Sequence, residues 1–155
     1  MLPDDMQGLA CPVQFGDPHN ALFDGLGEIL SAARTIAVVG AKDKPGTAVD
    51  MVGRYLIAAG YSVVPVHPVR QNVWGLPTYS TLADIPFSVD IINLFRASEH
   101  CPAHAGEVLD LAVLPALFWM QSGIQSAVAR EMLVPRGVRV VEDRCLMVDH
   151  RRLLR

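Results

Sequence analysis

The feature that most constrains the fold of this chain is a regular alternation of short apolar runs with longer segments of helical periodicity. The runs lie at residues 35–39, 62–66, 90–95, 116–119 and 138–142, and most are rich in Val and Ile. Continuous apolar runs of this kind are typical of strands that are buried on both faces of a parallel sheet. The alternation therefore predicts an α/β domain in which helices form right-handed crossovers between strands.

The segments between these runs carry apolar residues three or four positions apart, as amphipathic helices do. We expect helices that begin after Asn20, Thr47 and Ser98, whose side chains can accept hydrogen bonds from backbone N–H groups. The second ends at Gly60, which suits the left-handed position after a helix. The expected apolar face of the third helix consists of Ala105, Val108, Leu111 and Ala112. A further helix follows the fourth apolar run, with Ile124, Val128 and Met132 on its apolar face. Together these elements predict a Rossmann-like, doubly wound, five-stranded and mostly parallel sheet with helices on both faces.

The length and composition indicate one folded domain. A chain of 155 residues is long enough for a proper core, and 51% of its residues are hydrophobic while 19% are charged. That balance excludes a disordered chain. We expect a flexible N-terminal arm at 1–18, a single domain at 19–150 and a short basic tail at 151–155.

The charge and the cysteine content of the chain limit the kinds of partner that we expect it to bind. The net charge is −3 and there is no block of Lys or Arg, so a nucleic-acid partner is not expected. The first thirty residues carry no Lys or Arg, and no stretch is apolar enough to span a bilayer, so we expect no membrane partner and a cytoplasmic location. Cys11, Cys101 and Cys145 form no disulfide or zinc pattern. His100 and His104 give half a metal site at most, so no metal is expected.

Ligands of a doubly wound sheet bind beyond the carboxyl ends of its strands. After the first expected strand comes a turn, Gly40-Ala41-Lys42-Asp43-Lys44-Pro45, followed by Gly46 and the helix that begins at Thr47. Backbone N–H groups and the helix dipole at such a turn suit a phosphate, and Lys42 and Lys44 add positive charge.

The residues after the second strand bear on the type of nucleotide. The turn after the first strand is neither GxGxxG nor a P-loop. An NAD site would place an acid after the second strand, whereas this chain has His67 and Pro68 there, followed by Arg70. A cation at this position favours a ligand with an extra phosphate on its adenosine ribose. Coenzyme A and NADP both meet that description.

The order and spacing of several blocks resemble the stand-alone CoA-binding domain proteins, and through them the N-terminal CoA-binding domain of the succinyl-CoA synthetase α subunit. The resemblance covers about residues 31–150. The blocks are Ile36–Pro45, Val49–Leu56, Val64–Pro68, Trp74–Tyr79, Ser80–Pro86, Val89–Arg96, Phe118–Ile124 and Glu142–Cys145.

The resemblance implies a site for coenzyme A or acyl-CoA along the carboxyl edge of the sheet. It assigns the diphosphate to the turn and the helix start, namely Gly40, Ala41, Lys42, Lys44, Pro45 and Thr47. It places Val66, His67 and Pro68 beside the adenosine and Arg70 near the ribose phosphate. Phe95 and Arg96 would follow the pantetheine arm, and Gln121 and Gly123 would belong to the far wall.

Two positions depart from the family pattern. Relatives often carry a small polar residue where this chain has Lys42, and a serine where it has Val49. Lys42 can pair with a phosphate directly, whereas the Val49 side chain donates no hydrogen bond. The resemblance covers no counterpart of the second domain that supplies the synthetase's phosphohistidine, so that role falls to no residue here.

The leading hypothesis is a non-catalytic module that binds coenzyme A or acyl-CoA as a carrier, sensor or regulator. The sequence does not identify a protein partner. One alternative is an NADP-dependent oxidoreductase, motivated by Arg70, although the sequence offers no convincing proton donor. Another is thiol exchange between coenzyme A and Cys145. The competing interpretation is that Cys145 is a small buried side chain that only fills space in the core. No catalytic residue is assigned.

Overall fold

A computed structural model describes residues 25–154 of the chain. The expected arm at 1–18, the helix cap at Asn20 and Cys11 lie outside the described residues.

The predicted sheet is confirmed, and every strand pairing in it is parallel. Its five strands stand in the order β2-β1-β3-β4-β5. Their bounds are β1 Thr35–Val39, β2 Ser62–Val66, β3 Ile91–Leu94, β4 Leu117–Met120 and β5 Arg139–Val141. The chain runs outward from β1 to β2 and then crosses back to β3 on the other side of β1. The strand order therefore reverses between β1 and β3, where doubly wound sheets bind ligands.

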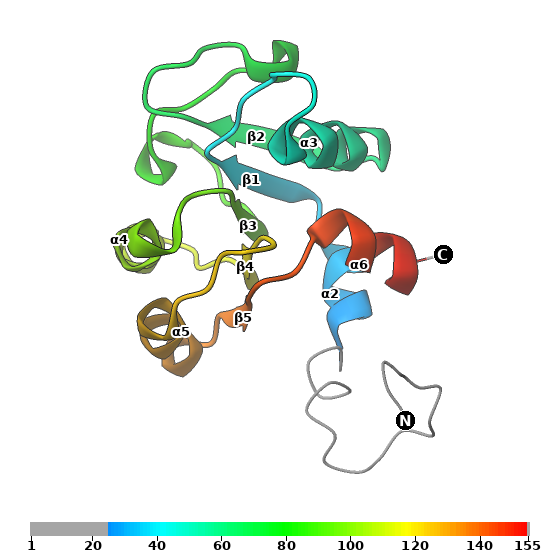
Figure 1. The fold of residues 1–155 in the computed structure, drawn as a ribbon. Coiled ribbons are helices and arrows are strands. Elements are labelled where there is room, and N and C mark those ends of the chain that lie inside the picture. The colour runs from blue at the N-terminus through cyan, green and yellow to red at the C-terminus, as the bar shows by residue number, and fades with distance from the viewer. Residues whose placement is uncertain (1–24, 155) are drawn as a thin grey trace.

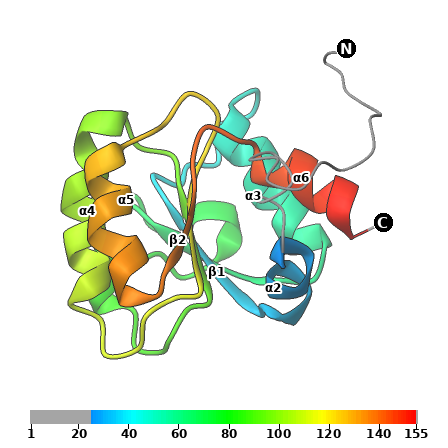
Figure 2. The same cartoon turned by 90° about the horizontal axis from the view of Figure 1, so that it is seen from below.

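Helices cover both faces of the sheet, as Figures 1 and 2 show. One face carries α2 (Leu26–Ala32), α3 (Ala48–Ala58) and α6 (Leu146–Leu153), and the other carries α4 (Cys101–Leu109) and α5 (Ala127–Leu133). Side chains alternate between the two faces along each strand. On β1, Ile36 and Val38 belong to the core under α2, α3 and α6, whereas Ala37 and Val39 belong to the opposite core.

Pro65 is compatible with β2 because β2 is an edge strand and needs no second complete ladder. The outer side of β2 meets a single bridge, in which the Tyr79 N–H donates to the Pro65 carbonyl at 3.0 Å and the His67 N–H donates to the Tyr79 carbonyl at 2.9 Å. This bridge holds the end of the segment 67–79 against the sheet.

The expected start of the third helix is wrong. Ser98–His100 form the 3-10 turn η4, and α4 begins at Cys101. The Ser98 hydroxyl instead accepts a hydrogen bond from the Gln125 N–H at 3.0 Å, in the loop after β4. A long-range contact thus takes the side chain that local reasoning assigned to a cap. Leu111 and Ala112 also lie beyond the end of α4.

The expected face of the next helix is also wrong. Ser126 caps α5 by accepting from the Ala129 N–H, and Ala129 and Leu133 are its buried residues. Val128 is 55% exposed, and Ile124 precedes the helix. The short turns η2 Val73–Gly75, η3 Leu82–Asp84 and η5 Val134–Arg136 complete the described elements.

The C-terminal segment forms a helix that the sequence analysis did not anticipate. α6 continues through Leu153, past the expected domain boundary at 150. His150 of this helix packs against α3, and its Nδ1 lies 2.7 Å from the Tyr55 hydroxyl. None of the helices within residues 25–154 has both the length and the apolar character that crossing a membrane requires.

Candidate functional site

A cavity of about 510 Å³ lies at the point where the strand order reverses. This volume falls within the range of small-molecule sites, roughly 300–1,000 Å³. The lining comes from the carboxyl ends of β1, β2 and β3 and from the start of α3. It consists of Gly40, Lys42, Thr47, Ala48, Val49, His67, Pro68, Phe95 and Arg96.

The turn after β1 is closed by two hydrogen bonds of its own. The Gly40 and Ala41 N–H groups both donate to the Val66 carbonyl, at 2.9 and 3.2 Å. Gly40 has a φ of 86°, and a Cβ there would lie 2.7 Å from the Phe95 carbonyl oxygen, so only glycine fits without strain. Ala41 and Val66 are fully or almost fully buried. These first two N–H groups of the turn already have an acceptor, so backbone donors without a partner have to be sought further along the chain.

The start of α3 supplies such donors. Thr47 caps the helix as expected: its Oγ1 accepts from the Asp50 N–H, and its own N–H donates to the Lys44 carbonyl. A helix leaves its first N–H groups without intrahelical partners. The structure gives no acceptor for the N–H groups of Ala48 and Val49 among the described residues, and both residues line the cavity. The Val49 backbone can therefore donate a hydrogen bond that its buried side chain cannot.

Positive charge gathers around the same cavity. Lys42 and Arg96 line it, and Arg70 lies at the end of the His67 turn. Partial burial, and then the nearby charges of Arg70, Arg96 and Lys42, lower the pKa of the His67 imidazole below its ordinary value. His67 is thus neutral near pH 7. Its Nδ1 accepts from the N–H groups of Val69 and Arg70, at 3.1 and 3.0 Å, which places the imidazole proton on Nε2.

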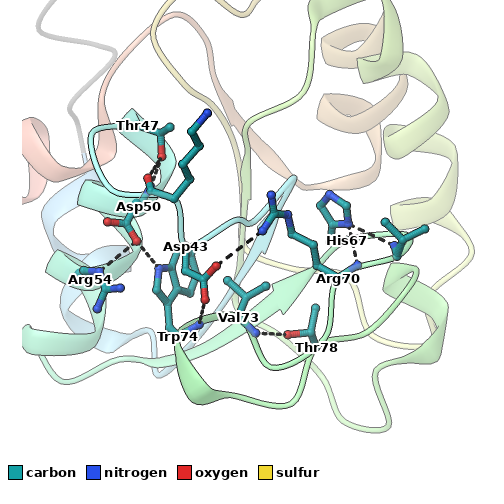
Figure 3. A network of polar contacts seen from close by, with 11 residues as sticks. Asp43, Thr47, Asp50, Arg54, His67, Arg70, Val73, Trp74 and Thr78 are labelled. Carbon is teal, nitrogen blue, oxygen red and sulfur yellow. Dashed lines mark hydrogen bonds and ion pairs between the residues drawn. The ribbon is translucent and has the colours of Figure 1, made fainter.

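Arg70 is not among the residues that line the cavity, and it lies beside a carboxylate of the neighbouring turn. Its Nη1 lies 3.6 Å from Asp43 Oδ1, while Asp43 Oδ2 accepts from the Trp74 N–H at 3.3 Å (Figure 3). Asp43 therefore ties the turn after β1 to the segment 67–79, which we call the strap.

The middle of the strap is fixed to α3. Trp74 Nε1 donates to Asp50 Oδ1 at 2.8 Å, and the Arg54 Nε donates to the same oxygen at 2.9 Å (Figure 3). The Trp74 ring lies over Gly53, where a Cβ would come within 2.2 Å of it. Asn72 and Trp74 both have positive φ, at 54° and 55°. These contacts fix the conformation of the strap, which carries His67 and Arg70.

The structure brings together seven of the residues that the resemblance assigned and separates the others from the cavity. The residues that line it are Gly40, Lys42, Thr47, His67, Pro68, Phe95 and Arg96. Lys44 and Pro45 are exposed on the same turn but outside the lining. Whether a ligand contacts any of these residues stays a prediction.

Gln121 and Gly123 have structural partners. Gln121 is 3% exposed, and its Oε1 accepts from the Leu146 N–H at 2.9 Å, at the start of α6. The Gly123 N–H donates to Asp143 Oδ1 at 2.6 Å. Neither group is directed at the cavity lining, so the far wall that the resemblance implies is not part of this cavity.

Sequence reasoning missed Asp43, Ala48 and Trp74. Ala48 could have been found, because it follows a recognisable cap and so carries an orphan N–H. Asp43 and Trp74 meet only through the folded strap, and no local pattern predicts their contact.

Other candidate groups remain separate from the cavity. Cys145 is half-buried and packs against the core under α2, α3 and α6, and His104 is paired with Glu107 at 2.9 Å. Within residues 25–154 there is no cluster of three His, Cys, Asp or Glu residues that could hold a metal ion.

Comparisons with known proteins agree with this architecture. The chain is 37% identical over 123 residues to the uncharacterized protein YneT of Bacillus subtilis (strain 168), covering 79% of this chain and 90% of that protein. A solved structure from Thermus thermophilus has a TM-score of 0.78 at 42% identity, covering 84% of this chain and 97% of that one. A hypothetical protein from Pyrococcus horikoshii OT3 has a TM-score of 0.83 at 29% identity, covering 92% and 100%.

A family model described as a CoA binding domain matches residues 34–151, from just before β1 into α6. That span contains the whole sheet and every residue that lines the cavity. The chain belongs to the CoA-binding domain family.

Proposed function

We propose that the protein binds coenzyme A or acyl-CoA in the cavity between β1 and β3, and that it does so without catalysing a reaction. The observation that carries this proposal is the meeting of two orphan N–H groups, from Ala48 and Val49, with Lys42 and Arg96 in one cavity. Orphan helix N–H groups and nearby cations bind phosphates. The family of the chain directs the choice of nucleotide to coenzyme A.

The residues present fit the chemical parts of coenzyme A. The start of α3 and Lys42 would hold the diphosphate, because they combine the helix dipole with a full charge. His67 and Pro68 would flank the adenosine, and the neutral imidazole offers its Nε2–H as a donor. Arg70, once it leaves Asp43, would take the ribose phosphate. Coenzyme A supplies a thiol that carries acyl groups.

The lining supports binding rather than catalysis. Among the described residues that line the cavity there is no carboxylate and no thiol. The one imidazole uses Nδ1 to accept two backbone N–H groups, so it is committed to holding the strap. A carrier, sensor or regulator needs no more than this arrangement offers.

NADP is the second candidate because it shares with coenzyme A the extra phosphate that Arg70 would bind. The two ligands differ beyond the diphosphate, where coenzyme A carries the pantetheine arm and NADP carries a ribose with nicotinamide. An oxidoreductase would bind NADP more tightly than coenzyme A and would reduce or oxidise it in the presence of a substrate.

Isothermal titration with coenzyme A, acetyl-CoA, NADP and NAD tests the proposal. We expect coenzyme A to bind with a Kd of about 1 μM, and NAD to bind far more weakly. Lys42→Ala should weaken coenzyme A about ten-fold or more, because a hydrogen bond to a charged group contributes about 1.5–3 kcal/mol. Arg136→Ala is the matched control, since Arg136 is exposed in η5, at the opposite end of the strands. Preferential binding of NADP would overturn the proposal in favour of the second candidate.

A further inference from the structure

Asn93 is the unexplained polar group of this structure. It sits in β3 with no exposed surface, and neither its Oδ1 nor its Nδ2 has a hydrogen-bond partner. A buried amide without partners destabilises a fold, so such a group calls for an explanation.

The other buried polar residues among those described are all paired. Asp50 accepts from Trp74 and Arg54, Gln121 accepts from the Leu146 N–H, and Asp149 is bound by the Arg144 guanidinium at 2.6 and 2.9 Å. The fold thus satisfies its buried polar side chains elsewhere, and Asn93 stands apart.

The strand register shows which core Asn93 faces. Asn93 pairs with Val38 on β1 and with Trp119 on β4, and both neighbours belong to the core under α2, α3 and α6. Asn93 therefore faces the same core. Phe95 lies two residues further along the strand, on the same face and roughly 7 Å away.

Phe95 belongs both to this core and to the cavity lining, and it is half-buried. Val49 does likewise from α3: its side chain is 4% exposed and belongs to the core, while the residue also lines the cavity. Asn93 thus faces a core that includes two residues of the cavity lining, Val49 and Phe95.

We propose that Asn93 is a specificity-determining residue that recognises an amide of the ligand's flexible arm once Phe95 moves aside. The proposal rests on the proposed function. A carboxamide side chain offers one acceptor and two donors, so it matches the C=O and N–H of a peptide-like amide. The pantetheine arm of coenzyme A contains two such amides, whereas the nucleotide part contains none. In the free protein no hydrogen bond of Asn93 has to be broken before its amide can bind a ligand amide.

The test compares coenzyme A with adenosine 3′,5′-bisphosphate, which has the ribose phosphate but lacks the pantetheine arm. In Asn93→Leu, a residue of similar size removes the amide. We expect coenzyme A to bind about ten-fold more weakly to this variant, the effect of losing one or two neutral hydrogen bonds, and the bisphosphate to bind as it does to the wild type. The urea midpoint of unfolding should rise, because an unpaired buried amide is gone.

Asn93→Ser provides a second variant should the leucine variant fail to fold. It keeps one hydroxyl and should show a smaller loss for coenzyme A, again with no change for the bisphosphate. Arg136→Ala is the control for both ligands.

The outcomes separate the two proposals. Wild-type affinity for coenzyme A in Asn93→Leu, or an equal loss for both ligands, would overturn the role of Asn93 and leave the proposed function standing. A wild-type protein that binds neither ligand would overturn both.

Discussion

A single carboxylate, Asp43, contacts both the guanidinium of Arg70 and the backbone N–H of Trp74. The ion pair is loose, at 3.6 Å, and its side chains are 42% and 39% exposed. Exposed pairs of this kind stabilise a protein by about 0–1 kcal/mol. A ligand phosphate that replaces the Asp43 carboxylate on Arg70 therefore faces only a weak competitor.

Substitution Asp43→Asn should tighten binding of coenzyme A. Asparagine keeps an oxygen for the Trp74 N–H but removes the charge that holds Arg70. The affinity for coenzyme A should rise about two- to five-fold, because the free energy of an exposed ion pair corresponds to a factor of this size. Isothermal titration with coenzyme A and dephospho-CoA measures it, and the gain should be larger for coenzyme A, which carries the ribose phosphate.

Arg70→Ala is the counterpart of this variant. As a single substitution, Arg70→Ala should weaken the binding of coenzyme A more than the binding of dephospho-CoA. In the Arg70→Ala background, Asp43→Asn should bring no further preference for coenzyme A. An undiminished gain there would mean that Asp43 acts on the ligand directly rather than through Arg70.

At the scale of elements, the strap and α3 behave as one unit. Trp74 donates to Asp50 and covers Gly53, so the helix that presents its N-terminus to the cavity also anchors the middle of the strap. The strap's near end places His67 at the cavity. The packing of one aromatic ring therefore supports both sides of the site.

Gly53→Ala and Gly106→Ala form a matched pair that tests this packing. Replacing a glycine inside a helix by alanine usually raises the free energy of unfolding by about 0.5–1 kcal/mol. Gly106 should show that gain, because its added Cβ would meet only the Met132 Cε at 4.0 Å. Gly53→Ala should instead lower the free energy of unfolding by about 1–3 kcal/mol, because the new methyl collides with the Trp74 ring. Urea unfolding measures both, and a gain at Gly53 would show that the ring shifts without cost.

At the scale of the whole molecule, α6 joins the C-terminal part of the chain to elements near its start. Tyr55 of α3 bonds His150, and the rings of Tyr55 and Tyr61 meet the His150 ring edge-on at centroid distances of 5.4 and 5.5 Å. Leu146 is fully buried in the core that α2 and α3 share. Figure 1 shows α6 beside α2 and α3 on one face of the sheet.

This packing predicts a loss of stability in mild acid. Burial lowers the pKa of His150 below its ordinary value of 6.5, and the pKa of His67 is lowered as well. The unfolded chain then binds more protons than the folded one as the pH falls below 6.5. The free energy of unfolding should therefore be at its full value above pH 6.5 and decline below it.

Urea unfolding of the wild type and of His150→Gln between pH 5 and pH 7.5 checks this expectation. The variant should be less stable at neutral pH, because the contacts of the ring with both tyrosines are lost. It should also depend less on pH. His100→Gln replaces a histidine of η4, which lies outside the contacts of α6 with α3, and serves as the control. An unchanged slope in His150→Gln would remove His150 from the effect.

The sequence alone determined the sheet and much of the cavity lining. Apolar runs predicted β1 and β2 to the residue, and the Thr47 cap and the Gly60 end of α3 followed from local chemistry. These features depend on neighbours within a few positions, which a linear pattern contains. Because carboxyl ends of parallel strands meet at one edge, the pattern also gathered most of the residues that line the cavity.

Only the tertiary structure decided how each polar group is used. The Val66 carbonyl takes the first N–H groups of the turn, Asp43 holds Arg70, and Gln121 caps the start of α6. Asn93 is left with no partner. These outcomes depend on residues that are distant in sequence and adjacent in space. A side chain's local pattern gives its capacity to hydrogen-bond, whereas its partner is set by the strand order and the packing of helices around it.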